Sequence, residues 1–510
     1  MVDISDKIAQ IKELIDRRCY FTINRARQYG KTTTLYELRR RLSNEYLVIK
    51  ISFEGLGNES FASSEQFCPA FLRLIASALE SPSVNTDPQY VEQWANYNIN
   101  KFDLLGRHIT KMCKDKRIVL LIDEVDKTSN NRVFLEFLSM LRSKFLARQG
   151  GDDYTFYSVI LAGVYDVKNI KLNMINQGLY IPSSTEDKTY NSPWNIAVNF
   201  NVDMSFCPAE ISTMLNDYQS EHNTGMNISK IAEEIYTYTS GYPFLVSRVC
   251  QCIDEELDKN WTIEGVQEAV KVILSEKNTL FDDLYKNLEN NTHLYDLIYD
   301  VLIIGTPRTF TLGNPTVDMA FMYGIIQRDK QYNRIAVSNR IYEIILADYF
   351  ISKDEASKDK KSVNILVRDL VKNGRFDMEL CFRKFAEHYA EIFNEDDLDF
   401  LERHGRLLFL SYLRPLINGQ GFYHIESQFT DLRRMDIVVD YGSDQFIIEL
   451  KLWKGEESER KACNQLLGYM ESKKSDTGYL LIFDFRKKDN RERKAEWVEI
   501  DGKRIFEVII

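Results

Sequence analysis

The sequence predicts a multidomain α/β protein, with a parallel sheet near its N-terminus and a second α/β domain near its C-terminus. Short apolar runs rich in β-branched residues alternate with helical periodicity over the first two hundred residues, and strands separated by helices form mostly parallel sheets. The chain has 510 residues, of which 44% are apolar, enough for roughly two to four packed domains. No internal repeat is present, which excludes solenoids.

The N-terminal sheet is expected to have five strands, within a core that covers residues 1–202. Each strand is a short, mostly apolar run, as is typical of buried strands, and the helical stretches between the runs supply the crossovers. The expected strands are Cys19–Ile23, Tyr46–Phe53, Arg117–Asp123, Thr155–Gly163 and Ile196–Val202.

Residues 203–280 have a helical pattern throughout and are expected to form a helical lid. Pro208 lies near the expected start of one helix, and Gly241-Tyr242-Pro243 separates two others. Proline fits the first turn of a helix and glycine commonly ends one, so both placements agree with separate helices in this segment.

Three further segments complete the chain. Residues 285–350 contain helices, a short alternating segment and a last helix, a pattern that fits a winged-helix connector and equally any other small helical connector. Residues 351–362 are dominated by Lys, Asp, Glu and small residues, so they are expected to be a linker. Residues 363–510 are long enough to hold a second α/β core.

The composition excludes several protein classes. No run of about 18 or more uncharged apolar residues occurs, so no membrane span is expected, and the N-terminus lacks the layout of a secretory signal, so we expect a cytoplasmic protein. The net charge of −11 argues against a protein that coats nucleic acid non-specifically. The eight cysteines and six histidines lack the spacing of zinc sites.

A phosphate-binding loop is predicted at Arg25–Thr32, which reads RARQYGKT between an expected strand and an expected helix, Thr33–Leu42. Such a loop needs backbone amides at a helix N-terminus, a mobile lysine and a hydroxyl for magnesium. Gly30, Lys31 and Thr32 supply the last three positions of G-x-x-x-x-G-K-S/T, and Arg25 replaces the first glycine. The alternative is an ordinary basic helix start.

A second motif supports the first. The apolar run Arg117–Ile122 ends in Asp123 and Glu124, and the end of a parallel strand is where a nucleotide-hydrolysing enzyme places metal-binding and water-orienting carboxylates. We expect Asp123 to hold magnesium together with Thr32, and Glu124 to orient the attacking water. The two motifs together predict ATP and Mg²⁺ as cofactors.

These motifs resemble the bacterial AAA-ATPase-like family, whose loops characteristically read Arg-Pro-Arg-Arg-Phe-Gly-Lys-Ser and also lack the first glycine. The resemblance covers about residues 1–280 and implies an origin-recognition or STAND-like ATPase core. It implies that Arg27 binds the nucleotide, and that Arg248, shortly after the lid motif Gly241-Tyr242-Pro243, senses phosphate. Gly163–Asp166 would occupy the sensor region.

A hairpin with two acids is predicted at Arg434–Lys451, around a turn at Gly442-Ser443. In a two-residue hairpin of this register Asp436 lies opposite Glu449, and Lys451 shares the face of Glu449. Facing carboxylates repel unless a cation lies between them, which suggests a divalent metal. Such acids, together with a lysine, suit phosphodiester cleavage.

This hairpin resembles the PD-(D/E)XK nuclease superfamily over about residues 400–490, which implies a restriction-endonuclease-like domain. Asp436, Glu449 and Lys451 match its Asp…Glu-x-Lys core, and Met435 stands where a proline is usual. The structural alternative is an ordinary hairpin whose acids are neutralised by neighbouring Arg and Lys side chains.

Auxiliary residues follow from the same resemblance. Gln465 and Tyr469, four positions apart on the next helix, look like the Gln-x-x-x-Tyr element of several branches. A further acid is expected from an earlier element, with Glu426 the first choice and Glu402 the second.

Three functions are compatible with these motifs. The leading hypothesis is an ATP-controlled nuclease that acts on nucleic acid, DNA in preference to RNA, with a homo-oligomer or a protein as partner. The second is a STAND-like nucleotide-dependent switch or scaffold with a catalytically silent nuclease fold. The third is a transcription regulator that binds DNA through the connector.

Overall fold

The computed structural model describes most of the chain in two compact units. The described residues are 2–82, 84, 86–125, 132–164, 194–304, 306–329, 331–357, 370–372, 375–392, 398–417, 421–426, 436–442, 444–453, 456–484 and 494–510. The first unit comprises Met1–Tyr236, Ser240–Ala269 and Met322–Gly324. The second comprises Thr237–Thr239, Val270–Phe321 and Ile325–Ile510.

The first unit contains a four-stranded sheet in the order β1-β4-β3-β2, and all of its strand pairs are parallel. This confirms the predicted parallel α/β core. The strands are β1 Phe21–Asn24, β2 Leu47–Ser52, β3 Ile118–Asp123 and β4 Ser158–Gly163.

The expected fifth strand, Ile196–Val202, is wrong. This segment pairs with the sheet only at an isolated parallel bridge between Val198 and Phe21. Ala197 packs into the apolar cluster on one face of the sheet and Phe200 into the cluster on the other. The apolar run therefore reflects a segment that crosses the edge of the sheet at β1.

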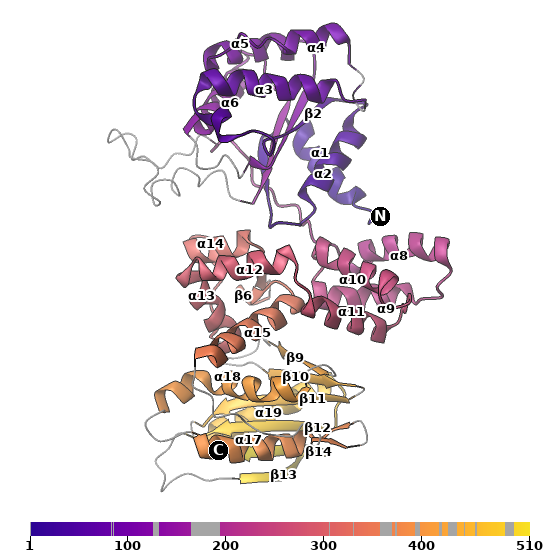
Figure 1. Ribbon diagram of the computed structural model, residues 1–510, viewed down its shortest axis with the longest axis vertical. Helices are drawn as coiled ribbons and strands as arrows, with labels where there is room; N and C mark the ends of the chain where they lie inside the picture. The colour runs from indigo at the N-terminus through magenta and orange to yellow at the C-terminus, as the bar shows by residue number, and fades with distance from the viewer. Residues whose placement is uncertain are drawn as a thin grey trace. The chain divides into compact units, whose positions relative to one another are not determined.

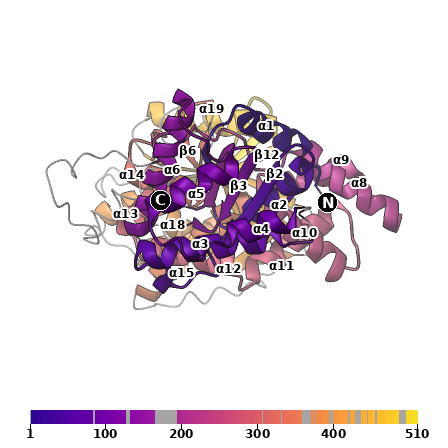
Figure 2. The same cartoon turned by 90° about the horizontal axis from the view of Figure 1, so that it is seen from above.

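Helices cover both faces of this sheet (Figures 1 and 2). The buried side chains of α1 and α2 pack with one face, and those of α3, α5 and α6 pack with the other. The elements are α1 Ser5–Asp16, α2 Lys31–Leu42, η1 Asn58–Phe61, α3 Ser64–Leu79, α4 Pro88–Trp94, α5 Phe102–Cys113 and α6 Arg132–Gly150.

The lid segment is helical, as its sequence pattern suggests. Pro208 and Pro243 each occupy the first turn of a helix. Gly241 has φ +72°, and a Cβ there would lie 1.8 Å from the Phe206 carbonyl oxygen, so only glycine fits at this break. The helices are α8 Pro208–His222, α9 Ile228–Thr239, α10 Pro243–Glu255 and α11 Ile263–Ser275.

The second unit begins with the connector. Helices precede a small antiparallel hairpin, β5 with β6, and a long helix follows, in the order expected from sequence; the winged-helix assignment stays a prediction. The elements are α12 Thr279–Glu289, α13 Thr292–Tyr299, η4 Asp300–Ile304, α14 Pro315–Met322, β5 Ile326–Asp329, β6 Arg334–Val337 and α15 Arg340–Ser357.

Part of the expected linker is helical instead, because α15 continues to Ser357. Ser352 and Lys353 are exposed on this helix, and a charged composition is typical of a solvated helix face as well as of a linker. Residues 358–369 lie outside the described part of the chain.

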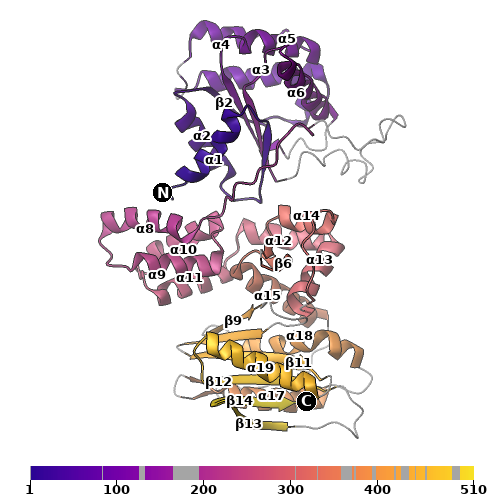
Figure 3. The ribbon, with the colours of Figure 1, turned by 180° about the vertical axis from the view of Figure 1, so that it is seen from behind.

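The C-terminal domain contains a six-stranded mixed sheet in the order β13-β14-β12-β11-β10-β9. Helix α19 lies on one face, and α17 and α18 lie on the other (Figure 3). Side chains of α19 join an apolar cluster with the sheet, and aromatic side chains of α17 and α18 pack on the opposite face. The elements are β7 Val371–Lys372, β8 Arg375–Phe376, α17 Met378–Ile392, α18 Leu398–Ile417, β9 Gly421–Glu426, β10 Asp436–Tyr441, β11 Asp444–Leu452, α19 Glu456–Ser472, β12 Thr477–Phe483, β13 Lys494–Ile500 and β14 Lys503–Ile509.

The connector and the C-terminal domain contact each other within the second unit. Arg414 of α18 pairs with Asp348 of α15 at 3.1 Å, and the Tyr423 hydroxyl of β9 donates to the same carboxylate at 3.0 Å. The boundary between the compact units therefore falls inside α11 rather than at residues 351–362.

Among the described helices, none combines the length and hydropathy needed to span a bilayer.

Candidate functional site

The predicted phosphate loop connects the end of β1 to the start of α2. The helix begins at Lys31, two residues earlier than expected, so the first backbone amides of α2 face the loop. Gln28 and Gly30 have φ values of +56° and +75°. Left-handed residues that alternate with right-handed ones turn successive N–H groups into one concavity, which is how backbone binds anions. The loop thus has the backbone form of a phosphate site.

Lys31 lies inside this loop and is 8% exposed. Its ammonium donates to the carbonyl oxygens of Arg25 and Ala26, each at 2.9 Å. A buried ammonium held by neutral carbonyls gains from exchanging them for charged oxygens, because charge-assisted hydrogen bonds are the stronger ones. The contact of Lys31 with phosphate stays a prediction.

Arg25, which replaces the first glycine of the loop motif, is held by main-chain carbonyl groups. Its guanidinium donates to the carbonyl oxygens of Asn24 at 2.9 Å and Val202 at 2.8 Å, and it lies 5.4 Å from the centre of the Phe200 ring. Burial lowers the pKa of Arg25. The arginine thus ties the loop to the segment that crosses the sheet edge.

The two predicted acids lie where β3 ends. Asp123 is 3% exposed, and its Oδ1 accepts from the Glu124 amide at 3.1 Å. Glu124 has φ +55°, an uncommon conformation for a residue with a side chain, which turns the chain sharply after the strand. An ion pair joins Asp123 to Lys50 of β2 at 3.6 Å. No local motif in the sequence marks Lys50.

Three other predicted nucleotide-binding residues are exposed or form an ion pair within the lid. Thr32 is exposed in the first turn of α2, and Arg27 is exposed in the loop. Arg248 pairs with Glu256 of the lid at 2.6 Å. Their contacts with nucleotide stay predictions. Of the expected sensor segment, Tyr165 and Asp166 lie outside the described residues.

The lid contacts the phosphate loop through Tyr242, a contact that the sequence analysis did not foresee. The Tyr242 hydroxyl donates to the carbonyl oxygen of Arg27 at 2.6 Å. Its ring meets that of Tyr29 edge to face, with centroids 4.6 Å apart, and the Tyr29 and Ser205 hydroxyls are 2.7 Å apart.

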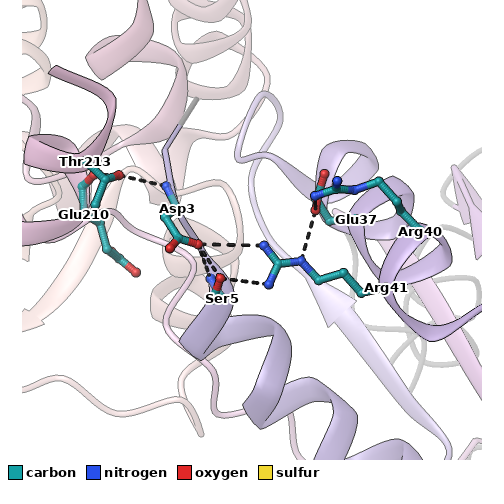
Figure 4. Close-up of polar contacts among 7 residues, drawn as sticks. All are labelled: Asp3, Ser5, Glu37, Arg40, Arg41, Glu210 and Thr213. Atoms are coloured by element: carbon teal, nitrogen blue, oxygen red, sulfur yellow. Dashed lines mark hydrogen bonds and ion pairs between the residues drawn. The ribbon is translucent and has the colours of Figure 1, made fainter. Parts of the chain in front are cut away.

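A second attachment joins the lid to the N-terminal residues (Figure 4). The Asp3 amide donates to the Thr213 hydroxyl of α8 at 2.9 Å, and Lys7 forms an ion pair with Glu210. The Asp3 carboxylate also lies 3.7 Å from Arg41 of α2. These contacts fasten the lid without touching the loop.

The acidic hairpin has the predicted register. Asp436 pairs with Glu449 on one side and with Glu426 on the other, so the three acids form a row across β11, β10 and β9. Residues opposite one another share a face of the sheet. Gly442 in the turn has φ +59°. Both turn types common in two-residue hairpins, I′ and II′, require a positive φ at this first central position.

The acid and the lysine of β11 differ in burial, since Glu449 is fully buried and Lys451 is half-buried. Glu449 is 0% exposed, and its Oε1 lies 3.2 Å from the ammonium of Lys451. The side chains of Asp436, Glu426 and Glu402 lie outside the description. Among the described side chains, no cluster of three or more His, Cys, Asp or Glu could hold a metal ion.

Helix α19 adds two buried oxygens on the Glu449 side of the sheet. Tyr469 packs in one apolar cluster with Ile447 of β11. Glu449 follows Ile447 by two residues on the same strand, so the two side chains lie on the same face of the sheet. Gln465 Oε1 and the hydroxyl of Tyr469, which is 3% exposed, are buried without a hydrogen-bond partner among the described residues. Oxygen atoms of this kind suit Mg²⁺ and its water ligands, so the residues fit a magnesium site.

Arg406 of α18 was also missed from sequence. Burial lowers the pKa of Arg406 to about 9, and the negative charge of Glu449 opposes the shift. Its guanidinium donates to the Ile303 carbonyl of the connector at 2.9 Å. No local motif marks this residue, because its partners lie far away in the sequence.

Comparisons with known proteins match the larger part of the chain to one family. The model of the AAA-like domain family matches residues 6–344. An uncharacterized protein of Methanocaldococcus jannaschii is 27% identical over 144 residues, 26% of this chain and 32% of that relative. An uncharacterized WD repeat-containing protein of Synechocystis is 22% identical over 357 residues, 66% of this chain and 28% of that relative. The chain therefore spans about a third or less of each curated relative.

Two solved structures of the ORC2 protein of Aeropyrum pernix resemble the chain distantly. The ADPNP-ADP complexes have a TM-score of 0.36 at 11% identity and cover 69% of this chain and 94% of that chain. The ADP form has a TM-score of 0.34 at 13% identity and covers 70% and 95%. TM-scores this low do not establish a shared fold.

Proposed function

Because the chain belongs to the AAA-like family over residues 6–344, we propose that it binds ATP at the phosphate loop and hydrolyses it with Mg²⁺. The observation that carries the proposal is the pair of left-handed residues, Gln28 and Gly30, beside the buried ammonium of Lys31. Amides turned inward at a helix N-terminus, with a lysine among them, are what phosphate binding requires.

Each residue has a distinct role in this proposal. Lys31 exchanges its carbonyl partners for phosphate oxygens. Thr32 and Asp123 would hold Mg²⁺, which supplies charge neutralisation at the transferred phosphate. Glu124 orients the attacking water, and Arg27 and Arg248 contact the phosphates.

ATP titration tests this part directly. Lys31→Ala removes the ammonium and is expected to weaken ATP binding at least about 100-fold, since it removes charge-assisted bonds in a water-poor site. Lys111→Ala, on the exposed surface of α5, is the matched control. Equal affinity in Lys31→Ala and the wild type would reject the loop as the ATP site.

The proposal extends to the C-terminal domain, which we suggest cleaves nucleic acid, DNA in preference to RNA, under control of the ATPase. Asp436 and Glu449 would hold Mg²⁺, and Lys451 would activate water and steady the developing charge. Glu426 would add an acid. The row of acids across three strands supports this assignment, as do the buried oxygens of Gln465 and Tyr469.

Strand cleavage tests the nuclease. Supercoiled DNA and a single-stranded RNA are incubated with the purified protein and Mg²⁺, with and without ATP. Lys451→Ala should abolish cleavage, and Lys461→Ala, an exposed lysine of α19, should not. Cleavage that survives Lys451→Ala would remove the nuclease from the proposal and leave the ATPase in place.

A nucleotide-dependent switch or scaffold is the second candidate. The family match ends at residue 344, and methionine replaces the usual proline at Met435, so the C-terminal domain could bind a partner without cutting. This candidate predicts ATP binding with no strand scission under any divalent metal. Either function would operate in the cytoplasm, with a homo-oligomer or a protein partner.

A further inference from the structure

We propose that Tyr242 of the lid is a positioning residue for phosphate binding, acting through the backbone of the phosphate loop. The inference rests on the proposed function, because it concerns how that loop holds ATP. Tyr242 is 2% exposed, and its hydroxyl donates to the Arg27 carbonyl oxygen at 2.6 Å. A lid residue therefore determines the orientation of a peptide group in the middle of the loop.

The geometry of the peptide group gives this bond its effect. The described peptide bonds are all trans, and in a trans peptide the C=O and the next N–H point in opposite directions. The Arg27 carbonyl points toward Tyr242, so the Gln28 amide points away from the lid. Gln28 and Gly30 are the left-handed residues that form the anion-binding concavity. The hydroxyl thus restrains the peptide group between Arg27 and the left-handed residue Gln28.

Packing keeps the phenol ring in place independently of its hydroxyl. The Tyr29 ring lies edge to face with it at 4.6 Å, and Pro243, the next residue, lies 3.9 Å from where a Cβ of Gly30 would stand. Tyr242→Phe therefore removes the hydrogen bond and retains the aromatic contact.

The attachment of the lid at Thr213 provides a matched control. The Thr213 hydroxyl accepts from the Asp3 amide at 2.9 Å (Figure 4), far along the chain from the loop. Thr213→Val removes one lid hydroxyl of nearly the same size, as Tyr242→Phe does. A general loosening of the lid affects both variants, whereas misorientation of the loop affects only Tyr242→Phe.

Calorimetric titration of the full chain with ATP, ADP, tripolyphosphate and adenosine tests the inference. Tyr242→Phe should bind ATP, ADP and tripolyphosphate about three- to tenfold more weakly, the effect of one hydrogen bond, and adenosine unchanged. Thr213→Val should stay within about twofold of the wild type for every ligand. Without nucleotide, amide exchange over residues 25–32 should be faster in Tyr242→Phe alone.

Several results would overturn the inference. Unchanged ADP affinity in Tyr242→Phe, equal losses in Thr213→Val, or an equal loss for adenosine would each show that the hydroxyl does not position the loop. If Lys31→Ala abolishes ATP binding and Tyr242→Phe leaves it intact, only this inference fails. If the wild type binds no ATP, the proposed function fails with it.

Discussion

The end of β3 and the acidic hairpin each place a buried acid beside a lysine, but they assemble the pair differently. Asp123 and Lys50 come from neighbouring parallel strands and lie 3.6 Å apart. Glu449 and Lys451 come from one strand and lie 3.2 Å apart. Residues two apart on a strand share a face in any fold, whereas cross-strand neighbours depend on strand order. Only the second pair can therefore be recognised in the sequence.

A third pair, Lys144 with Asp153, shows what a structural ion pair looks like in the same chain. Its atoms are 2.7 Å apart, and the Thr110 hydroxyl bonds to both side chains. The two pairs at the candidate sites are longer. The greater separations, 3.6 and 3.2 Å against 2.7 Å, distinguish them from this pair.

Removing the charge of Glu449 should give the largest effect. Glu449→Gln keeps the shape of the side chain and removes a proposed metal ligand, so we expect Mg²⁺-dependent cleavage to fall about 10²–10³-fold and ATP affinity to stay unchanged. Glu457→Gln, on the exposed surface of α19, is the control in the cleavage assay. If Glu449→Gln lowers the cleavage rate less than about tenfold, Glu449 and Lys451 form a structural ion pair rather than part of a metal site.

The corresponding change in the first unit is Glu124→Gln. It should slow ATP hydrolysis about 100-fold, within the range for a lost general base, because the amide orients and activates water poorly. The dissociation constant for ATP should remain within about threefold. Phosphate release and ATP titration measure the two quantities, with Glu136→Gln on α6 as control. Weakened binding with unchanged turnover would contradict the assigned role.

Lys144→Met should affect stability only. Burial alone would raise the pKa of Asp153, but bonds from Lys144 and Thr110 outweigh it and hold the pKa below its ordinary value. The free energy of unfolding should fall by about 2 kcal/mol at neutral pH, and ATP affinity should not change. Because a lowered carboxyl pKa stabilises the fold above that pKa, the difference from wild type should shrink below about pH 4. Urea unfolding at both pH values checks the sign.

Lys50→Met should give the smallest change in stability, about 1 kcal/mol, because its ion pair is longer and the methionine keeps the stem packed beside Tyr36. Without the competing ammonium, Asp123 should accept Mg²⁺ more readily. We expect the Mg²⁺ concentration for half-maximal ATP hydrolysis to fall about threefold. An unchanged Mg²⁺ requirement, with a stability loss as large as that of Lys144→Met, would make this pair structural.

Local patterns predicted much of the fold and the register of the acidic hairpin. The four paired strands of the first sheet match their apolar runs closely, and the hairpin register followed from the two-residue turn. Ile196–Val202 was misread because an apolar run does not distinguish a paired strand from a segment that packs on both faces while crossing a sheet edge.

The contacts that sequence reasoning missed are long-range. Tyr242, although part of the predicted lid motif, is separated from its partner Arg27 by 215 positions, and Arg406 is separated from Ile303 by 103. No periodic pattern marks such contacts, because periodicity reports burial within one element. The linker prediction was wrong at the charged end of α15 for a related reason, since composition alone does not separate a solvated helix from a linker.

The anchored Arg25 implies a lasting electrostatic background at the N-terminal site. Its guanidinium is held by main-chain carbonyls, so it contributes a fixed positive potential that no single change at Lys31 erases. Polyanions would still be drawn toward the phosphate loop by long-range attraction, weakly and without selectivity, and added salt would screen that attraction. Residual association of polyanions at low ionic strength therefore would not distinguish the Lys31→Ala variant from the wild type.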